Sequence, residues 1–126
     1  MKLTNPATGT TLLDVETDSA KTIRAKFVRA RAAQPAWAAL PLVKRLAALR
    51  KFRDIVSDRS EELARTLTLE VGKPIRQSRN EMNGLVARID FFLGEAAKTL
   101  REEKVFADGT MDERIGHEPL GVIANI

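Results

Sequence analysis

Apolar side chains recur every three or four residues from Gly72 to Leu100, which is the spacing of one face of an α-helix. Gly72 suits the end of a preceding helix, and Pro74 suits the first turn of the next one. We therefore predict a long helix over about 74–100, which spans roughly 39 Å at ~1.5 Å per residue. An apolar face of that length needs a large partner surface. Its positions are Ile75, Met82, Leu85, Val86, Ile89, Phe92, Leu93, Ala96 and Leu100.

Shorter helical patterns precede this stretch. Asp18 or Ser19 is predicted to cap a first helix, which Pro35 ends. A second helix opens at Pro41, and a capping box of Asp58 with Glu61 starts a third that closes at Gly72. The apolar positions of the first helix are Ile23, Phe27 and Ala30, and those of the second are Leu42, Leu46, Leu49, Phe52 and Val56.

Extended segments are predicted at both ends of the chain. The turn Asn5-Pro6-Ala7-Thr8-Gly9 joins segments 1–4 and 10–16 into a hairpin. A second hairpin is predicted around Asp108-Gly109. Leu120–Ile126 is almost wholly apolar, which is typical of a parallel strand buried on both faces. Such a strand needs neighbouring strands and covering helices, so the sequence resembles the front end of a larger α/β protein.

Gly84 interrupts the long helical pattern, where glycine costs roughly 1 kcal/mol relative to alanine. One interpretation is a tolerated surface glycine. The other is a close approach of a second helix or a ligand to the backbone at this position.

The composition is that of an ordinary globular protein, with 44% hydrophobic and 30% charged residues in 126. No apolar run approaches the ~20 residues of a membrane span, and no secretory signal is visible, so we expect a cytoplasmic location and no membrane partner. The absence of cysteine excludes disulfides, thiolate metal sites and a cysteine nucleophile within these residues.

The net charge of +4 comes from two basic clusters, each interleaved with an apolar helical stripe as on any solvated helix. No aromatic residues alternate with these cations for base stacking, so we expect no nucleic-acid partner. The clusters are Lys21, Arg24, Lys26, Arg29 and Arg31, then Lys44, Arg45, Arg50, Lys51 and Arg53.

Candidate catalytic chemistry is sparse. His117 is the only histidine, and Glu118 beside it would point to the opposite face of a strand, so the two do not form an acid–base dyad. Gly72-Lys73 lacks the upstream glycine and the Ser/Thr of a phosphate loop, and no Gly-x-Gly-x-x-Gly occurs. Lys73 is better explained as a cation near a helix C-terminus. The carboxylates Glu61, Glu62, Glu70 and Asp90 are expected on solvated helix faces.

Four motifs in this order resemble the N-terminal part of the aldehyde dehydrogenase family. They are the Asn5–Gly9 turn, Arg31–Trp37, Glu61–Ala64 leading to Leu67–Pro74, and His117–Ile123 within the segment 114–126. Glu70–Pro74 and Glu118–Val122 are the more specific pieces. The resemblance covers essentially the whole chain but a minority of a full family member.

The resemblance implies an α/β fold in which this chain forms a β-hairpin, three to four helices, a second hairpin and the first strand of a parallel cofactor-binding sheet. The implied division is 1–104 for the N-terminal hairpin and helical part of the cofactor-binding domain, 105–119 for a hairpin that bridges subunits, and 120–126 for the first strand of the dinucleotide-binding sheet. A homo-oligomer is therefore expected.

The family's reaction is oxidation of an aldehyde to a carboxylic acid with NAD or NADP through a cysteine thioester. Its cysteine, glutamate base and cofactor-binding lysine and glycine loop have no counterparts here. No catalytic or cofactor-binding residue can be assigned, and this chain alone is expected to be inactive and to bind no cofactor.

Two peripheral roles are implied by the resemblance. Backbone oxygens of Leu3 and Thr4 with the carboxylate of Glu70 match the positions that hold a monovalent cation in some relatives, although Glu70 also fits a solvated helix carboxylate. Asn83, Gly84 and Ala87 match positions that line the substrate entrance, with packing as the competing explanation.

Two other classes of function remain open at this stage. A stand-alone helical module that binds a full-length dehydrogenase subunit or another protein predicts a compact monomer or a defined oligomer without cofactor affinity. A basic helical nucleic-acid binder predicts steeply salt-dependent binding. The dehydrogenase fragment instead predicts exposed apolar surface over 120–126 and poor solubility alone.

Overall fold

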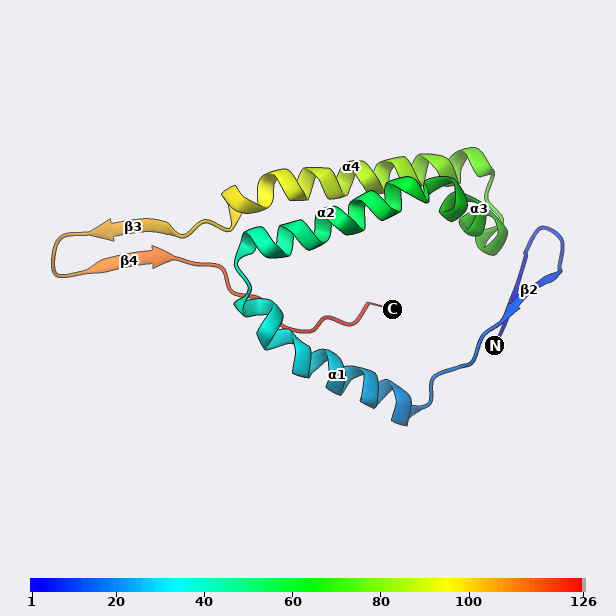
Figure 1. Ribbon diagram of the computed structural model, residues 1–126, viewed down its shortest axis with the longest axis horizontal. Helices are drawn as coiled ribbons and strands as arrows, with labels where there is room; N and C mark the ends of the chain where they lie inside the picture. The colour runs from blue at the N-terminus through cyan, green and yellow to red at the C-terminus, as the bar shows by residue number, and fades with distance from the viewer. Residues whose placement is uncertain (126) are drawn as a thin grey trace.

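The computed structural model describes residues 1–125, which form four helices and two separate two-stranded antiparallel sheets (Figure 1). The predicted α/β class is confirmed, and so is the long helix expected over about 74–100. In chain order the elements are β1 (Lys2–Thr4), β2 (Thr11–Asp14), α1 (Ala20–Ala39), α2 (Leu42–Asp58), α3 (Ser60–Val71), α4 (Ile75–Thr99), β3 (Glu103–Ala107) and β4 (Asp112–Ile115).

Helices α2, α3 and α4 form the packed body of the molecule, with α2 and α4 side by side and α3 crossing one end (Figure 1). The buried apolar side chains of the described residues are Leu46 and Val56 of α2 and Ala64 of α3. The hydroxyls of Thr68 and Ser78 share a hydrogen bond of 2.8 Å between α3 and α4, and Ser78 is fully buried. This bond satisfies a polar group that burial would otherwise penalise.

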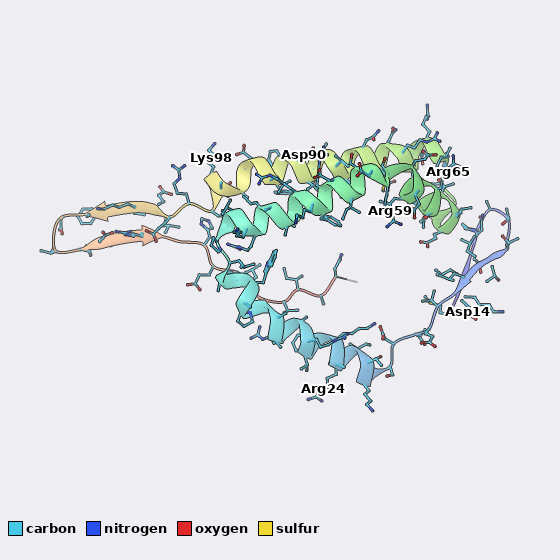
Figure 2. All side chains as sticks on the ribbon, viewed as in Figure 1. Asp14, Arg24, Arg59, Arg65, Asp90 and Lys98 are labelled. Carbon is cyan, nitrogen blue, oxygen red and sulfur yellow. The ribbon has the colours of Figure 1, made fainter. Side chains whose placement is uncertain are left out.

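Two bidentate ion pairs tie the same helices together at the surface. Both guanidinium bonds from Arg53 of α2 to Asp90 of α4 are 2.8 Å. Figure 2 labels Asp90 on α4, which runs beside α2. Arg79 of α4 makes two bonds of 2.8 Å to Glu61 of α3. Bidentate pairs fix relative orientation as well as distance, so they hold α4 in register with its neighbours.

Helix α1 lies apart from this body and contains no buried residue (Figure 1). The Ser19 side chain caps it by accepting the Thr22 N–H at 3.2 Å, which confirms the predicted start. The predicted end at Pro35 is wrong, because α1 continues through Pro35 to Ala39. Proline removes one backbone donor from a helix, and the alanine-rich turn after it favours continued helix.

The predicted capping box at Asp58 is also wrong. Asp58 is the last residue of α2, and Arg59 is both the C-cap of α2 and the N-cap of α3, with no side-chain cap. The Arg59 N–H donates to the Ile55 carbonyl at 3.0 Å, and the Arg59 carbonyl accepts from the Leu63 N–H at 3.0 Å. Arg59 therefore serves both helices, and no other residue lies between them to act as a separate N-cap of α3.

Strands β1 and β2 form the predicted N-terminal hairpin, with Leu3 opposite Leu13. The buried Asn5 organises its turn, because its side-chain oxygen accepts the Ala7 N–H and its carbonyl accepts the Gly9 N–H, at 2.9 and 2.8 Å. Gly72 ends α3 in the left-handed conformation (φ 77°), as predicted. A Cβ placed on Gly72 would lie 2.6 Å from Cγ of Pro6, so the hairpin turn rests directly on the α3–α4 connection.

Strands β3 and β4 form the second predicted hairpin, which projects beyond the helices (Figure 1). Asp108 holds its loop by accepting the N–H groups of Thr110 and Met111 at 2.9 and 3.0 Å, and Gly109 takes a positive φ of 92°. Every residue of both strands is exposed.

The expected strand over Leu120–Ile126 is not formed in the described part, residues 120–125; Ile126 lies outside the described residues. A strand is defined by pairing with a neighbour, and both hairpins of the described chain are closed two-stranded units that do not reach this segment. Gly121 has a φ of 97°, which also interrupts an extended run. The expected exposure is confirmed, with Leu120 91% and Ile123 73% exposed.

The chain exposes far more surface than a compact protein of its mass. Its accessible area is 10362 Å², whereas a compact 14.0 kDa protein exposes about 6,700 Å². None of the helices among residues 1–125 combines the length and the apolar character needed to cross a membrane.

Candidate functional site

A small cavity of about 180 Å³ lies between α3 and α4, lined by Ser60, Glu61, Arg79, Met82 and Asn83. Glu61 accepts bonds from Arg79 and also lies 2.8 Å from Arg65 of the same helix. The hydrogen bonds from Arg79, supported by the nearby Arg65, lower the pKa of Glu61 from its ordinary value of 4.5 to about 2. A carboxylate this acidic stays ionised at neutral pH, so it stabilises the helix pair and does not act as a general acid or base.

The lowered pKa of Glu61 predicts a stability change in acid. Because the folded-state pKa lies below 4.5, the ion pair contributes fully above about pH 4.5 and is lost as the pH falls toward 2. In the complete protein, we expect Glu61→Gln to flatten the fall of the urea unfolding midpoint between pH 6 and pH 3. Glu16→Gln is the control, since Glu16 is exposed and makes no ion pair among residues 1–125, and it should retain the wild-type slope. Equal slopes for wild type and Glu61→Gln would contradict this prediction.

The three residues expected at a substrate entrance are all exposed on α4. Asn83 borders the cavity beside Glu61, on the side of α4 nearest α3. Gly84 and Ala87 are exposed, and a Cβ placed on Gly84 would meet no atom within 4 Å. No part of the described chain therefore approaches the Gly84 backbone closely.

Open space at Gly84 predicts that Gly84→Ala raises the free energy of unfolding by about 1 kcal/mol, because alanine is the better helix former. Gly94→Ala is a matched control, since Gly94 also lies inside α4 with nothing within 4 Å. Chemical denaturation measures both. A gain at Gly94 with a loss at Gly84 would show that another part of the complete protein contacts the Gly84 backbone.

The predicted cation ligands lie on two elements that the fold brings near each other. Leu3 and Thr4 belong to β1, directly before the Asn5–Gly9 turn, and Glu70 is the penultimate residue of α3. The contact of Pro6 with Gly72 joins the segments that follow each of them. Among residues 1–125 no cluster of three or more His, Asp or Glu side chains has the geometry of a metal site, so a cation here would depend on backbone oxygens and one carboxylate.

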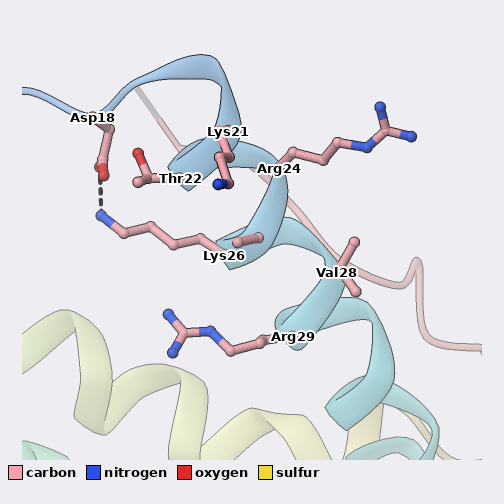
Figure 3. A pocket seen from close by; sticks show the side chains of 8 residues that line it. Asp18, Lys21, Thr22, Arg24, Lys26, Val28 and Arg29 are labelled. Carbon is pink, nitrogen blue, oxygen red and sulfur yellow. Dashed lines mark hydrogen bonds and ion pairs between the residues drawn. The ribbon is translucent and has the colours of Figure 1, made fainter.

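A shallow hollow with several basic side chains lies on α1 (Figure 3). Lys26 pairs with Asp18 across it, and this bond with that of Thr22 lowers the pKa of Asp18. Figure 3 shows Arg24 and Arg29 pointing in different directions, away from a common centre. Cations that do not converge cannot hold an anion between them, so the hollow is not a phosphate site as it stands.

A wholly apolar groove of about 220 Å³ runs between α2 and α4. Several of its side chains are largely exposed, including Phe52 at 53% and Phe92 at 59%. An exposed apolar surface of this kind is typical of a site that contacts another protein segment, a membrane or a ligand. Its lining residues are Leu46, Leu49, Phe52, Ile89, Phe92, Leu93 and Ala96.

Comparison with known proteins identifies the family. The model described as "Aldehyde dehydrogenase family" matches residues 1–126. This chain belongs to the aldehyde dehydrogenase family. It is similar to the N-succinylglutamate 5-semialdehyde dehydrogenase of Chromobacterium violaceum, with 36% identity over 98% of this chain and 25% of that protein. The succinate-semialdehyde dehydrogenase [NADP(+)] of Deinococcus radiodurans is 32% identical over 97% of this chain and 25% of that protein.

Solved aldehyde dehydrogenase structures share the same arrangement. Aldehyde dehydrogenase 21 from Physcomitrella patens, in complex with the reaction product succinate, superposes with a TM-score of 0.79 and 31% identity. The match covers 86% of this chain and 22% of that one. The chain thus spans about a quarter of the length of its relatives.

The described residues bring together no aldehyde dehydrogenase catalytic group. His117 is exposed beyond the end of β4, and Lys73 pairs with Glu81 across the α3–α4 connection. Sequence reasoning placed Glu61 and Asp90 on solvated faces and missed their roles in joining helices. Their arginine partners lie 18 and 37 residues away, and no local spacing signals a pair at such a separation.

Proposed function

We propose that this chain is the N-terminal part of a subunit that oxidises an aldehyde to the carboxylic acid, with hydride transfer to NAD(P)+. The observation that carries the proposal is the family match over residues 1–126, together with relatives about four times as long. These residues contain no cysteine and no Gly-x-Gly-x-x-Gly, so the thioester-forming thiolate and the nucleotide site would belong to another part of the subunit. This part would serve as scaffold.

The substrate class that fits best is an aldehyde bearing a carboxylate at its far end. Succinate semialdehyde and N-succinylglutamate 5-semialdehyde, in the names of the two relatives above, both have this form. The succinate bound by the Physcomitrella enzyme is the oxidation product of such an aldehyde.

The scaffold role extends to assembly and to two peripheral sites. The projecting, fully exposed β3–β4 hairpin supports the proposed use of 105–119 as a bridge between subunits of a homo-oligomer. Helix α4 would line the substrate passage with Gly84 and Ala87, with Asn83 at the α3 side. Leu3, Thr4 and Glu70 would hold a monovalent cation at the contact between the hairpin and α3.

The intact mass of the protein purified from its source is the first test. A mass several-fold above 14.0 kDa, with NAD(P)H formed only when an aldehyde is added, would support the proposal. A larger protein that reduces neither NAD+ nor NADP+ with any aldehyde would contradict it. A mass near 14.0 kDa, with a defined oligomer and no cofactor affinity, would instead favour a stand-alone module that binds another protein.

A further inference from the structure

The segment that follows β4 touches the rest of the described chain near Gly121. It returns past α1 (Figure 1), and residues 116–125 are exposed except for Gly121 and Val122, which are half-buried. A terminal guanidinium nitrogen of Arg31, on α1, lies 3.3 Å from the position that a Cβ on Gly121 would occupy. Apart from the neighbours of Gly121 in the chain, no other atom of residues 1–125 lies within 4 Å of that position. This contact therefore joins α1 to the segment 120–125.

Both residues at this contact suit a close approach of a side chain to backbone. Gly121 has a φ of 97°, and without a Cβ its peptide groups are open to the flat guanidinium. Arg31 is available for the contact, because α1 contains no acidic residue and Lys26 is the only one of its described cations in an ion pair. A guanidinium carries five N–H donors in one plane, which matches the carbonyl groups of an extended segment.

The place of the contact matters because of what the segment would become. In the proposed subunit, residues up to 126 would form the first strand of the dinucleotide-binding sheet, and Gly121 would lie at its start. Ligands of open parallel sheets bind beyond the carboxyl ends of the strands. That end lies about 17 Å from Gly121, at ~3.3 Å per residue. An extended backbone hardly changes its length, so fixing the start of the strand also fixes where it ends.

We infer that Arg31 is a positioning residue for the nicotinamide cofactor, an inference that rests on the proposed function. Its guanidinium holds the Gly121 backbone against α1 and so sets the position at which the first strand of the sheet ends. Arg31 touches neither the cofactor nor the aldehyde. Its loss should therefore weaken cofactor binding and leave the KM for the aldehyde and the kcat at saturating cofactor unchanged.

The test measures cofactor binding and turnover separately in the complete enzyme. The fluorescence of NADH and of NADPH gives the Kd of each, and succinate semialdehyde serves as the aldehyde. Arg31→Ala should raise the Kd of the preferred cofactor about tenfold, because a misplacement of ~1 Å from a distant change can cost about 100-fold. Arg31→Lys keeps the charge but not the planar fork, so it should raise the Kd less, by about threefold.

Arg29→Ala is the matched control. Arg29 is an exposed cation of α1 that forms no ion pair among residues 1–125, and it lies two residues before Arg31, so it faces another side of the helix. It should leave the Kd at the wild-type value, and its urea unfolding midpoint should equal that of Arg31→Ala. If Arg31→Ala does not fold, Arg31→Lys decides: an unchanged Kd overturns the inference, and a raised Kd with an unchanged aldehyde KM supports it.

Three other results would overturn the inference. The cofactor Kd could be unchanged in Arg31→Ala, the KM for the aldehyde could rise as much as the cofactor Kd, or Arg29→Ala could act as strongly as Arg31→Ala. In all three the wild-type enzyme is active, so the proposed function stands while the role of Arg31 is removed. A complete protein that neither binds NAD(P)H nor oxidises an aldehyde would overturn the proposed function, and the inference with it.

Discussion

Replacing Gly72 with alanine is expected to lower the free energy of unfolding by roughly 2–5 kcal/mol, the sum of two effects. The first is conformational: Gly72 has φ 77°, where a Cβ costs about 1–2 kcal/mol. The second is steric: the new Cβ would lie 2.6 Å from Cγ of Pro6, so the hairpin or the helix end must move, at about 1–3 kcal/mol. The measurement is the urea unfolding midpoint of the complete subunit.

Two further variants separate these effects. Gly9 also has a positive φ (73°) but meets nothing within 4 Å, so Gly9→Ala should show the conformational cost alone. Pro6→Ala removes the clashing Cγ, so adding Gly72→Ala to Pro6→Ala should cost no more than Gly9→Ala. The difference between the two Gly72→Ala costs is the coupling energy of the contact. Equal costs of Gly72→Ala with and without Pro6 would show that the turn does not rest on Gly72 in the protein.

The 126-residue chain produced by itself is expected to self-associate and to lack a cooperative unfolding transition. Its surface exceeds that of a compact protein of the same mass by about 3,700 Å², enough for several protein–protein interfaces of standard size. Much of the excess is apolar, because large hydrophobic side chains such as Phe27, Phe92 and Leu120 are each more than half exposed. Only Leu46, Val56 and Ala64 form a buried apolar core among the described residues.

Light scattering after size exclusion measures this association, and the near-ultraviolet circular dichroism of Trp37 reports whether the packing is fixed. We expect species above 14.0 kDa, binding of an apolar dye and a weak Trp37 signal. The matched control is the complete subunit, in which the same surfaces should be covered and unfolding should be cooperative. A 14.0 kDa monomer with a sharp transition would contradict the prediction and favour the stand-alone module.

Local signals in the sequence were sufficient for most element ends. Ser19, Gly72 and Asp108-Gly109 act through backbone groups within a few residues, so their capping and turn roles follow from residue type. The predicted helix end at Pro35 and the predicted capping box at Asp58 were wrong because both rested on the local preference of one residue type. Helix α1 continues through Pro35 to Ala39, whereas α2 ends at Asp58 and Arg59 serves as the cap of both α2 and α3. The apolar pattern of Leu120–Ile126 predicted a strand. A strand also needs a paired neighbour, and no local sequence pattern shows whether one is present.

The sequence by itself determined the family, the order of hairpins and helices, and the absence of a cysteine nucleophile, because motifs and composition are properties of neighbouring residues. Only the tertiary structure decided which charges are paired, because it joined Arg79 to Glu61 and Arg53 to Asp90. It also placed Pro6 against Gly72 and opened the space beside Gly84. Such contacts join residues far apart in the chain, and they arise only when helix packing fixes which faces meet.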